Sequence, residues 1–136
     1  MEKINLKWHG EMAFSTDIEG EHLRFDAAEE HGGKGKGARP KPFVLAALAG
    51  CTAMDVASML RKMKVELEDF NITVEAEMSN EHPKIYHKIH LIYEFKGKDL
   101  PLAKLEKAIN LSQDQYCGVN AMLKKAAEIS YEIKLI

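Results

Sequence analysis

The sequence predicts an α+β domain, and three observations lead to this fold class. Short segments with alternating apolar residues occur near the N-terminus, in the middle and at the C-terminus, a pattern typical of β-strands. One almost uniformly apolar segment begins at Pro42 and indicates a buried helix. The expected order is three strands, the buried helix, two strands, two helices and a last strand, which segregates antiparallel strands from helices as α+β domains do.

Length and composition are consistent with a single domain spanning residues 1–136. A chain of 136 residues, 46% of them hydrophobic, can bury a core without a metal or a disulfide, so we expect no cofactor. Its 19 basic and 21 acidic residues give a net charge of −2, which disfavours nucleic acid as a partner. The first residues lack the apolar run of a signal peptide. We therefore expect a cytoplasmic protein with reduced cysteines.

The N-terminal segment is predicted to form three short antiparallel strands between Ile4 and Asp26. Apolar residues alternate there, and His9–Gly10 and Glu19–Gly20 supply tight turns. The following segment, Ala28–Lys41, is rich in glycine and has no periodicity, so it is expected to be an irregular loop. No Gly-Lys-Ser/Thr follows it, which argues against a phosphate-binding loop.

The central helix is predicted to begin at Pro42 and to end at the charges from Arg61 to Lys64. It is apolar on nearly every face, so it must be buried. Its apolar run ends before Asp55, which is too short for a membrane span, and no membrane partner is expected. We predict a central helix covered by a sheet.

The remaining elements follow from the same periodicities. Alternation predicts strands, helical spacing predicts helices, and Cys117–Gly118 interrupts the helical region. In chain order they are a strand over Val65–Met78, a turn over Ser79–Pro83, a strand over Ile85–Phe95, a helix from about Pro101 to Gln115, a short helix over Val119–Ala127 and a strand over Ile129–Leu135.

The two cysteines are the main candidates for chemistry. Cys51 lies among apolar helix residues, where a small buried hydrophobic residue is the simpler interpretation. Cys117 precedes a helix whose first amides point back toward it, a position that lowers a thiol pKa, although a partly buried structural residue is equally consistent. Their separation excludes a Cys-x-x-Cys motif but does not restrict their distance in space.

Neither a metal site nor a serine hydrolase is predicted. His87 and His90 are three residues apart on a strand and face opposite sides of the sheet, while the other four histidines are scattered in turns and loops. No Gly-x-Ser-x-Gly motif is present.

Three segments together resemble the OsmC/Ohr family, the osmotically induced protein C and organic hydroperoxide resistance proteins. They are Arg39–Val56, which contains Gly50-Cys51-Thr52-Ala53-Met54-Asp55, the upstream Glu30–Gly33 and the downstream Gln115–Leu123. The resemblance covers nearly the whole chain. It is strongest to the short OsmC-like branch that carries Gly-Cys-Thr-Ala-x-Asp-Val.

This resemblance implies a fold, an activity and partners. The fold is an intertwined homodimer with antiparallel sheets wrapped around a long buried central helix in each chain. The activity is that of a thiol peroxidase, in which Cys51 attacks the peroxide and becomes a sulfenic acid, and Cys117 resolves it to a disulfide. A dithiol reductant, such as a lipoyl protein, recycles the enzyme. Residues expected to help line an apolar substrate pocket are Phe43, Leu48, Met54 and Met122.

An attacking cysteine in an apolar site needs a nearby cation. In the family's peroxidases this is an arginine from an early loop, held by a glutamate of an Asn-Pro-Glu stretch. Here Lys41-Pro42 stands where the glutamate is expected, and Met12–Asp17 lacks arginine. Arg39 is the candidate substitute, with a solvated loop cation as the alternative, and Lys41 is weaker because it lacks a planar fork. Asp55, one turn after Cys51, is assigned a structural or hydrogen-bonding role.

Three functions remain open from the sequence. The first is reduction of organic hydroperoxides through a Cys51–Cys117 disulfide. The second is non-enzymatic binding of a small apolar ligand, which the missing arginine and glutamate partners favour. The third is thiol-based redox sensing through a partner.

Overall fold

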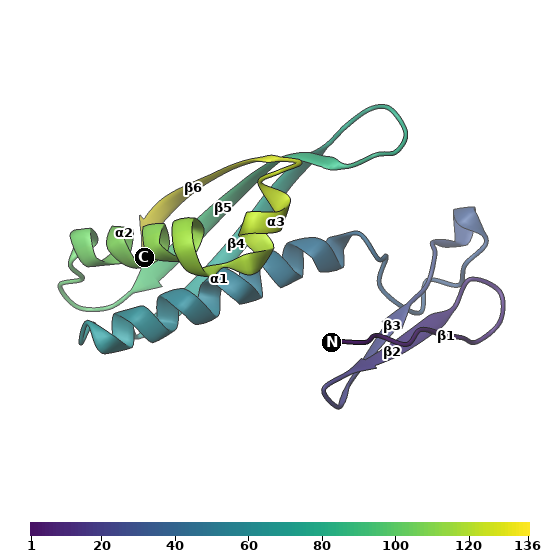
Figure 1. The fold of residues 1–136 in the computed structure, drawn as a ribbon, viewed down its shortest axis with the longest axis horizontal. Helices are drawn as coiled ribbons and strands as arrows, with labels where there is room; N and C mark the ends of the chain where they lie inside the picture. Colours follow the sequence, from purple (N-terminus) through teal and green to yellow (C-terminus); the bar gives the residue numbers. More distant parts are fainter. The chain divides into compact units, whose positions relative to one another are not determined.

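The structure is a computed structural model that describes all residues from Met1 to Ile136, in the order of elements predicted from the sequence. It divides into two compact units, Met1–Val44 and Leu45–Ile136 (Figure 1). Each unit contains one three-stranded sheet. Together they form the α+β fold that the sequence predicts.

The first unit is built on an antiparallel sheet of β1 (Lys7–Trp8), β2 (Phe14–Ile18) and β3 (Glu21–Phe25). This confirms the three predicted strands. The glycine-rich segment that follows is irregular, as predicted, apart from one turn of 3-10 helix, η1 (Glu29–His31).

The carboxylate of Asp26 organises the glycine-rich loop. It accepts hydrogen bonds from the backbone N–H groups of Ala27 (2.8 Å), Lys36 (3.2 Å) and Lys34 (3.3 Å). A Cβ atom at Gly33 would lie 1.9 Å from the Ala27 carbonyl oxygen, so only glycine fits there. Burial opposes ionisation of Asp26, but these N–H groups outweigh it, and the pKa of the carboxyl lies below its ordinary value.

We expect the loop to open in acid. Because the folded pKa of Asp26 is lowered, its stabilisation is fully present above the unfolded value of ~3.9 and is lost as the pH falls through the folded value. Amide hydrogen exchange at Lys34 and Lys36 measures this: protection should fall below pH ~4 in the wild type and should be low at every pH in Asp26→Asn. Asp17→Asn, which changes an exposed carboxylate, is the control. Unchanged protection of the wild type in acid would contradict this role of Asp26.

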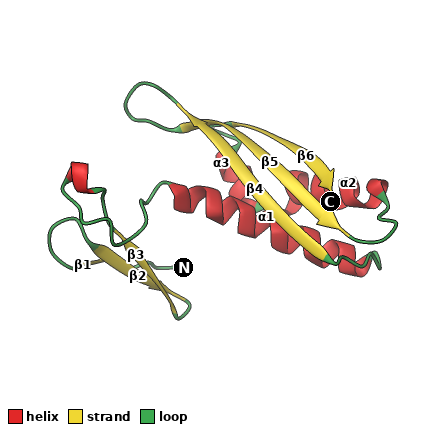
Figure 2. Cartoon of the chain, turned by 180° about the vertical axis from the view of Figure 1, so that it is seen from behind, coloured by secondary structure: helices red, strands yellow, loops and turns green.

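The second unit packs helices on one face of its sheet. The strands are β4 (Asp69–Met78), β5 (Tyr86–Lys96) and β6 (Glu128–Leu135). The helices are α1 (Pro42–Lys62), which begins at the end of the first unit, α2 (Leu102–Leu111) and α3 (Gly118–Leu123). Figure 1 shows the helices in front of the sheet, and Figure 2, from behind, shows the strands in front of the helices.

One strand differs from the expectation of antiparallel sheets. β4 and β5 form an antiparallel hairpin, but β6 pairs with β5 in parallel, with Ile89 opposite Ile129 and Tyr93 opposite Ile133. The reason is the connection between β5 and β6. α2 and α3 return the chain to the end of the sheet where β5 began, and a parallel pair requires a crossover of this kind.

The core of this unit lies between the sheet and the helices. Ile89, Leu91 and Tyr93, which alternate along β5, are buried there together with Phe95. The buried residues of α1 are one turn apart: Leu48, Thr52, Val56 and Leu60. Those of α2 are Leu105, Ala108 and Ile109.

The central helix is buried on one face only within this chain. The sequence predicts burial on nearly every face, and this prediction is wrong for the single chain. Met54 is exposed, because the sheet of the second unit covers a single stripe of the helix. α1 is 21 residues long, so by length and composition it qualifies as a membrane span, contrary to the prediction that it is too short. Its buried stripe nevertheless makes it the core helix of this unit.

Candidate thiol site

The central helix brings two of the reactive groups together. Cys51 and Asp55 are four residues apart on α1, so their side chains lie on the same face, one turn apart. Thr52, between them in sequence, lies on the fully buried stripe of the helix. A continuous helix therefore fixes the spacing between this thiol and this carboxylate.

A π-helical turn positions the other thiol. α2 continues into η2 (Ser112–Tyr116), and the Cys117 N–H donates to the Ser112 carbonyl oxygen at 2.8 Å. Cys117 is extended (φ −77°, ψ 99°) and caps α3, where its Sγ accepts the Asn120 N–H at 3.3 Å. The predicted break at Cys117–Gly118 is thus present, although α3 ends at Leu123 rather than at Ala127.

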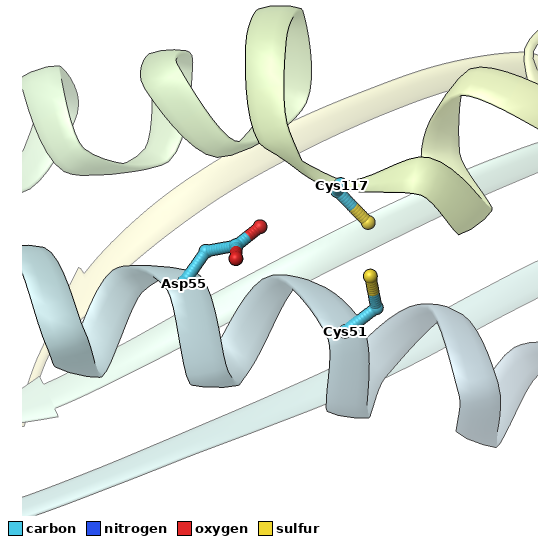
Figure 3. A group of neighbouring side chains, drawn as sticks. All are labelled: Cys51, Asp55 and Cys117. Atoms are coloured by element: carbon cyan, nitrogen blue, oxygen red, sulfur yellow. The ribbon is translucent and has the colours of Figure 1, made fainter.

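The two thiols and the Asp55 carboxylate converge on one point. The Sγ atoms of Cys51 and Cys117 and a carboxylate oxygen of Asp55 all lie within 4.8 Å of one another. Figure 3 shows the two sulfur atoms directed toward each other between α1 and the segment above it. Both cysteines are free thiols. Residues that are far apart in the sequence therefore meet at one site.

Arg39, the third predicted site residue, lies in the first unit. Its Nη1 donates to the carbonyl oxygens of Gly37 at 2.8 Å and Asp26 at 3.2 Å. These bonds hold the guanidinium on the glycine-rich loop. In the second unit, no salt bridge involves Asp55.

Burial keeps the Cys117 thiol protonated. Cys117 is only 3% exposed, whereas Cys51 is half-buried. Burial, followed by the hydrogen bond with Cys51, raises the pKa of Cys117 to about 11, although the Asn120 N–H acts in the opposite direction. The prediction that the helix start lowers this pKa is therefore wrong. The amide is present, but removal of the thiol from water outweighs it.

A chain of buried hydrogen bonds starts at Asp55. The Ser112 hydroxyl donates to Asp55 Oδ2 at 2.9 Å. Its oxygen is 2.8 Å from Thr52 Oγ1, which in turn is 2.8 Å from the Tyr93 hydroxyl. Because a carboxylate can only accept hydrogen bonds, the Ser112 hydroxyl donates to Asp55. Thr52 must then donate to Ser112, and Tyr93 must donate to Thr52. The hydrogen-bonding role predicted for Asp55 is confirmed.

The chain continues to the second thiol. Gln113 Nε2 donates to the Tyr93 hydroxyl at 2.9 Å, and Asn120 Nδ2 donates to Gln113 Oε1. The backbone N–H of Asn120 then bonds to Cys117 Sγ. Side chains from α1, β5, η2 and α3 are therefore joined in one network, with no buried side-chain polar atom left unpaired.

Sequence reasoning missed the residues of this network as parts of the site. Thr52 and Asn120 lie inside the segments that carry the family resemblance, next to Cys51 and close to Cys117. That position is the one signal in the sequence that could have identified these two residues. The missed residues are Thr52, Tyr93, Ser112, Gln113 and Asn120.

The residues predicted to line a pocket have different environments. Leu48 is wholly buried in the core, whereas Met54 and Met122 are exposed. Phe43 belongs to the first unit, where its ring lies 4.7 Å from that of Phe25. A cavity of about 600 Å³ opens beside the thiol site instead, lined by residues of α1, α2 and η2 that include Asp55, Met59, Leu111 and Tyr116.

Comparisons with known proteins agree with the fold and with the family resemblance. The sequence profile described as OsmC-like protein matches residues 33–132. Protein YhfA of Escherichia coli K12 is 34% identical over 101 residues, which are 74% of this chain and 75% of that protein. The crystal structure of a hypothetical protein from Aquifex aeolicus VF5 is similar, with a TM-score of 0.84 and 29% identity over 100% of this chain and 98% of that one. The organic hydroperoxide resistance protein OsmC of Legionella pneumophila shares the fold, with a TM-score of 0.72 and 18% identity over 98% of each chain. The chain belongs to the OsmC-like protein family.

Proposed function

We propose that this protein is a thiol-dependent peroxidase that reduces organic hydroperoxides. The observation that carries the proposal is the approach of the Cys51 and Cys117 sulfur atoms, which lie within 4.8 Å of each other. Membership of the OsmC-like family, and the fold shared with an organic hydroperoxide resistance protein, support this choice of substrate class.

The first step is attack of the Cys51 thiolate on the distal peroxide oxygen. The S–O bond forms as the O–O bond breaks, so the sulfur is oxidised to a sulfenic acid and the hydroperoxide is reduced. The alkoxide that leaves takes up one proton and departs as an alcohol. Cys51 is the better attacking group because it is half-buried, whereas Cys117 is almost completely buried.

The second step joins the two sulfurs. Cys117 attacks the Cys51 sulfenic acid, its thiol proton combines with the departing hydroxide, and water and a disulfide result. A disulfide requires an S–S distance of about 2.05 Å, so the sulfurs must move closer. Cys51 is fixed within a long helix, while Cys117 is an extended residue between η2 and α3. We infer that Cys117 moves toward Cys51.

The proposal includes a homodimer, a dithiol reductant and an activating role for Arg39. The apolar side chains that α1 exposes, Val44 and Met54, favour a second copy of the chain as their cover. Arg39 is proposed as the cation that stabilises the Cys51 thiolate in this assembly. A reducing cytoplasm is the proposed location, because the thiols must be regenerated.

Single-turnover oxidation tests the function. We expect the reduced protein, mixed with one equivalent of cumene hydroperoxide, to consume it and to lose two thiols per chain, with a Cys51–Cys117 disulfide identified by peptide mass spectrometry. With dihydrolipoamide as the reductant and excess cumene hydroperoxide, turnover should continue.

Two other results would replace the proposal. Thiols that survive a large excess of cumene hydroperoxide would favour the ligand-binding alternative, which the missing arginine and glutamate partners support. A disulfide that forms but is not recycled by the dithiol would favour a redox sensor.

A further inference from the structure

The thiol site has the composition of a metal site, and we propose that Cys51, Asp55 and Cys117 bind a zinc ion. Thiolate sulfur and carboxylate oxygen are both common zinc ligands. The three ligand atoms lie within 4.8 Å of one another, and a tetrahedral zinc with Zn–S bonds of ~2.3 Å holds its sulfurs ~3.8 Å apart. Shortening the S–S distance by at most about 1 Å therefore brings the two sulfurs into the geometry of a zinc site.

The structure already orients two of the three ligands. Ser112 donates to Oδ2 of Asp55, which leaves Oδ1 for a metal. The Asn120 N–H donates to Cys117 Sγ without occupying its remaining lone pairs. Hydrogen bonds of this kind, from outside the ligand set, fix the direction of metal ligands and strengthen binding.

Charge favours a cation at this point. The site gathers one carboxylate and two ionisable thiols, and no lysine, arginine or histidine forms a salt bridge with Asp55. A divalent ion would offset the charge of the three ligands, and it displaces the thiol protons as it binds, so affinity rises with pH. The cavity beside Asp55 reaches this carboxylate, and Lys62 and Lys107 also line it.

Three protein ligands leave one position of a tetrahedral zinc free for water. This departs from the sequence-based expectation of no metal, which considered the spacing of the histidines and the lack of a Cys-x-x-Cys motif. The proposed site uses no histidine, and its ligands come from α1 and from the start of α3.

Zinc and peroxide would compete for the same sulfurs. If the proposed peroxidase function holds, the zinc-bound thiolates react with a hydroperoxide and two protons to give the disulfide, an alcohol, water and free zinc. Zinc would then protect the reduced protein, and oxidation would release the metal. Zinc binding itself does not depend on the peroxidase function.

Metal titration without peroxide tests the site. Anaerobic, reduced protein is titrated with Co²⁺, read by the thiolate-to-cobalt charge-transfer absorption, and with Zn²⁺ against a chromogenic chelator. We expect one ion per chain and tetrahedral cobalt bands. Asp55→Asn should weaken Zn²⁺ binding by at least ~10-fold. Asp114→Asn, which changes an exposed carboxylate of the neighbouring η2, should bind like the wild type.

The Cys51→Ser/Cys117→Ser double variant and the oxidised wild type lack both thiolates. Their Zn²⁺ affinity is the reference with which the reduced wild type is compared. Zn²⁺ binding by the reduced wild type that is no tighter than theirs would overturn the proposal. Asp55→Asn binding as tightly as the wild type would also overturn it, because the carboxylate would then not be a ligand. Since no peroxide is present, either result leaves the proposed peroxidase function to its own test.

Discussion

A Cys117→Ser variant is expected to reduce one equivalent of an organic hydroperoxide per chain and then stop, whereas Cys51→Ser is expected to reduce none. In the first variant Cys51 can still attack the peroxide, but no thiol lies beside it to form the disulfide. In the second, the attacking sulfur itself is missing. Rapid-mixing measurement of cumene hydroperoxide consumption gives both amplitudes, and steady-state turnover with dihydrolipoamide should fall to the buffer background in Cys51→Ser.

A trapping reagent distinguishes the roles of the two sulfurs. Dimedone, which reacts with sulfenic acids, should label Cys51 in the oxidised Cys117→Ser variant. Little labelling is expected in the wild type, because Cys117 consumes the sulfenic acid. Label on Cys117 in the Cys51→Ser variant, accompanied by peroxide consumption, would reverse the assignment. Wild-type turnover by Cys117→Ser would remove Cys117 as the resolving residue.

Thr52→Val is expected to lower the free energy of unfolding by ~1–3 kcal/mol. Valine has nearly the same shape as threonine, so no cavity forms. Thr52 is fully buried, and its hydroxyl lies 2.8 Å from both Tyr93 and Ser112. Its loss leaves the Tyr93 O–H without an acceptor in a buried site. Urea unfolding, followed by circular dichroism, measures the change.

Thr73→Val is the matched control, because Thr73 is exposed on β4 and the same substitution there should change stability by less than ~0.5 kcal/mol. We also expect faster alkylation of Cys117 in Thr52→Val, since the network that ends at Asn120 then holds the segment around Cys117 less firmly. Equal stability of the two valine variants would show that the hydrogen bonds of Thr52 contribute nothing net.

The fold could be predicted from the sequence because its signals are local. The alternation from Ile89 to Tyr93 identified the buried face of β5, and the run after Pro42 identified the central helix. The parallel pairing of β6 could not be predicted, because it depends on where α2 and α3 return the chain. The exposure of Met54 likewise depends on how many faces of α1 the sheet covers.

The site was only partly predictable, for a related reason. Cys51 and Cys117 could be identified from their motifs, but their proximity depends on the packing of α1 against η2 and α3. The polar chain through Tyr93 and Ser112 has no sequence periodicity at all. The sequence predicts the wrong direction for the pKa of Cys117, because helix position can be inferred from a sequence, whereas the depth of burial around one sulfur atom cannot.

The reactivity of the two thiols depends on the number of residues in η2, the π-helical turn before Cys117. An α-helix rotates by ~100° per residue and a π-helix by less, so the deletion of a single residue between Ser112 and Tyr116 would turn everything downstream by roughly a quarter of a circle relative to α2. Cys117 would then no longer face Cys51, even though every side chain of the site was still present. Among related sequences, a gap in this segment should therefore mark proteins that have lost the dithiol, and such gaps can be counted without any assay.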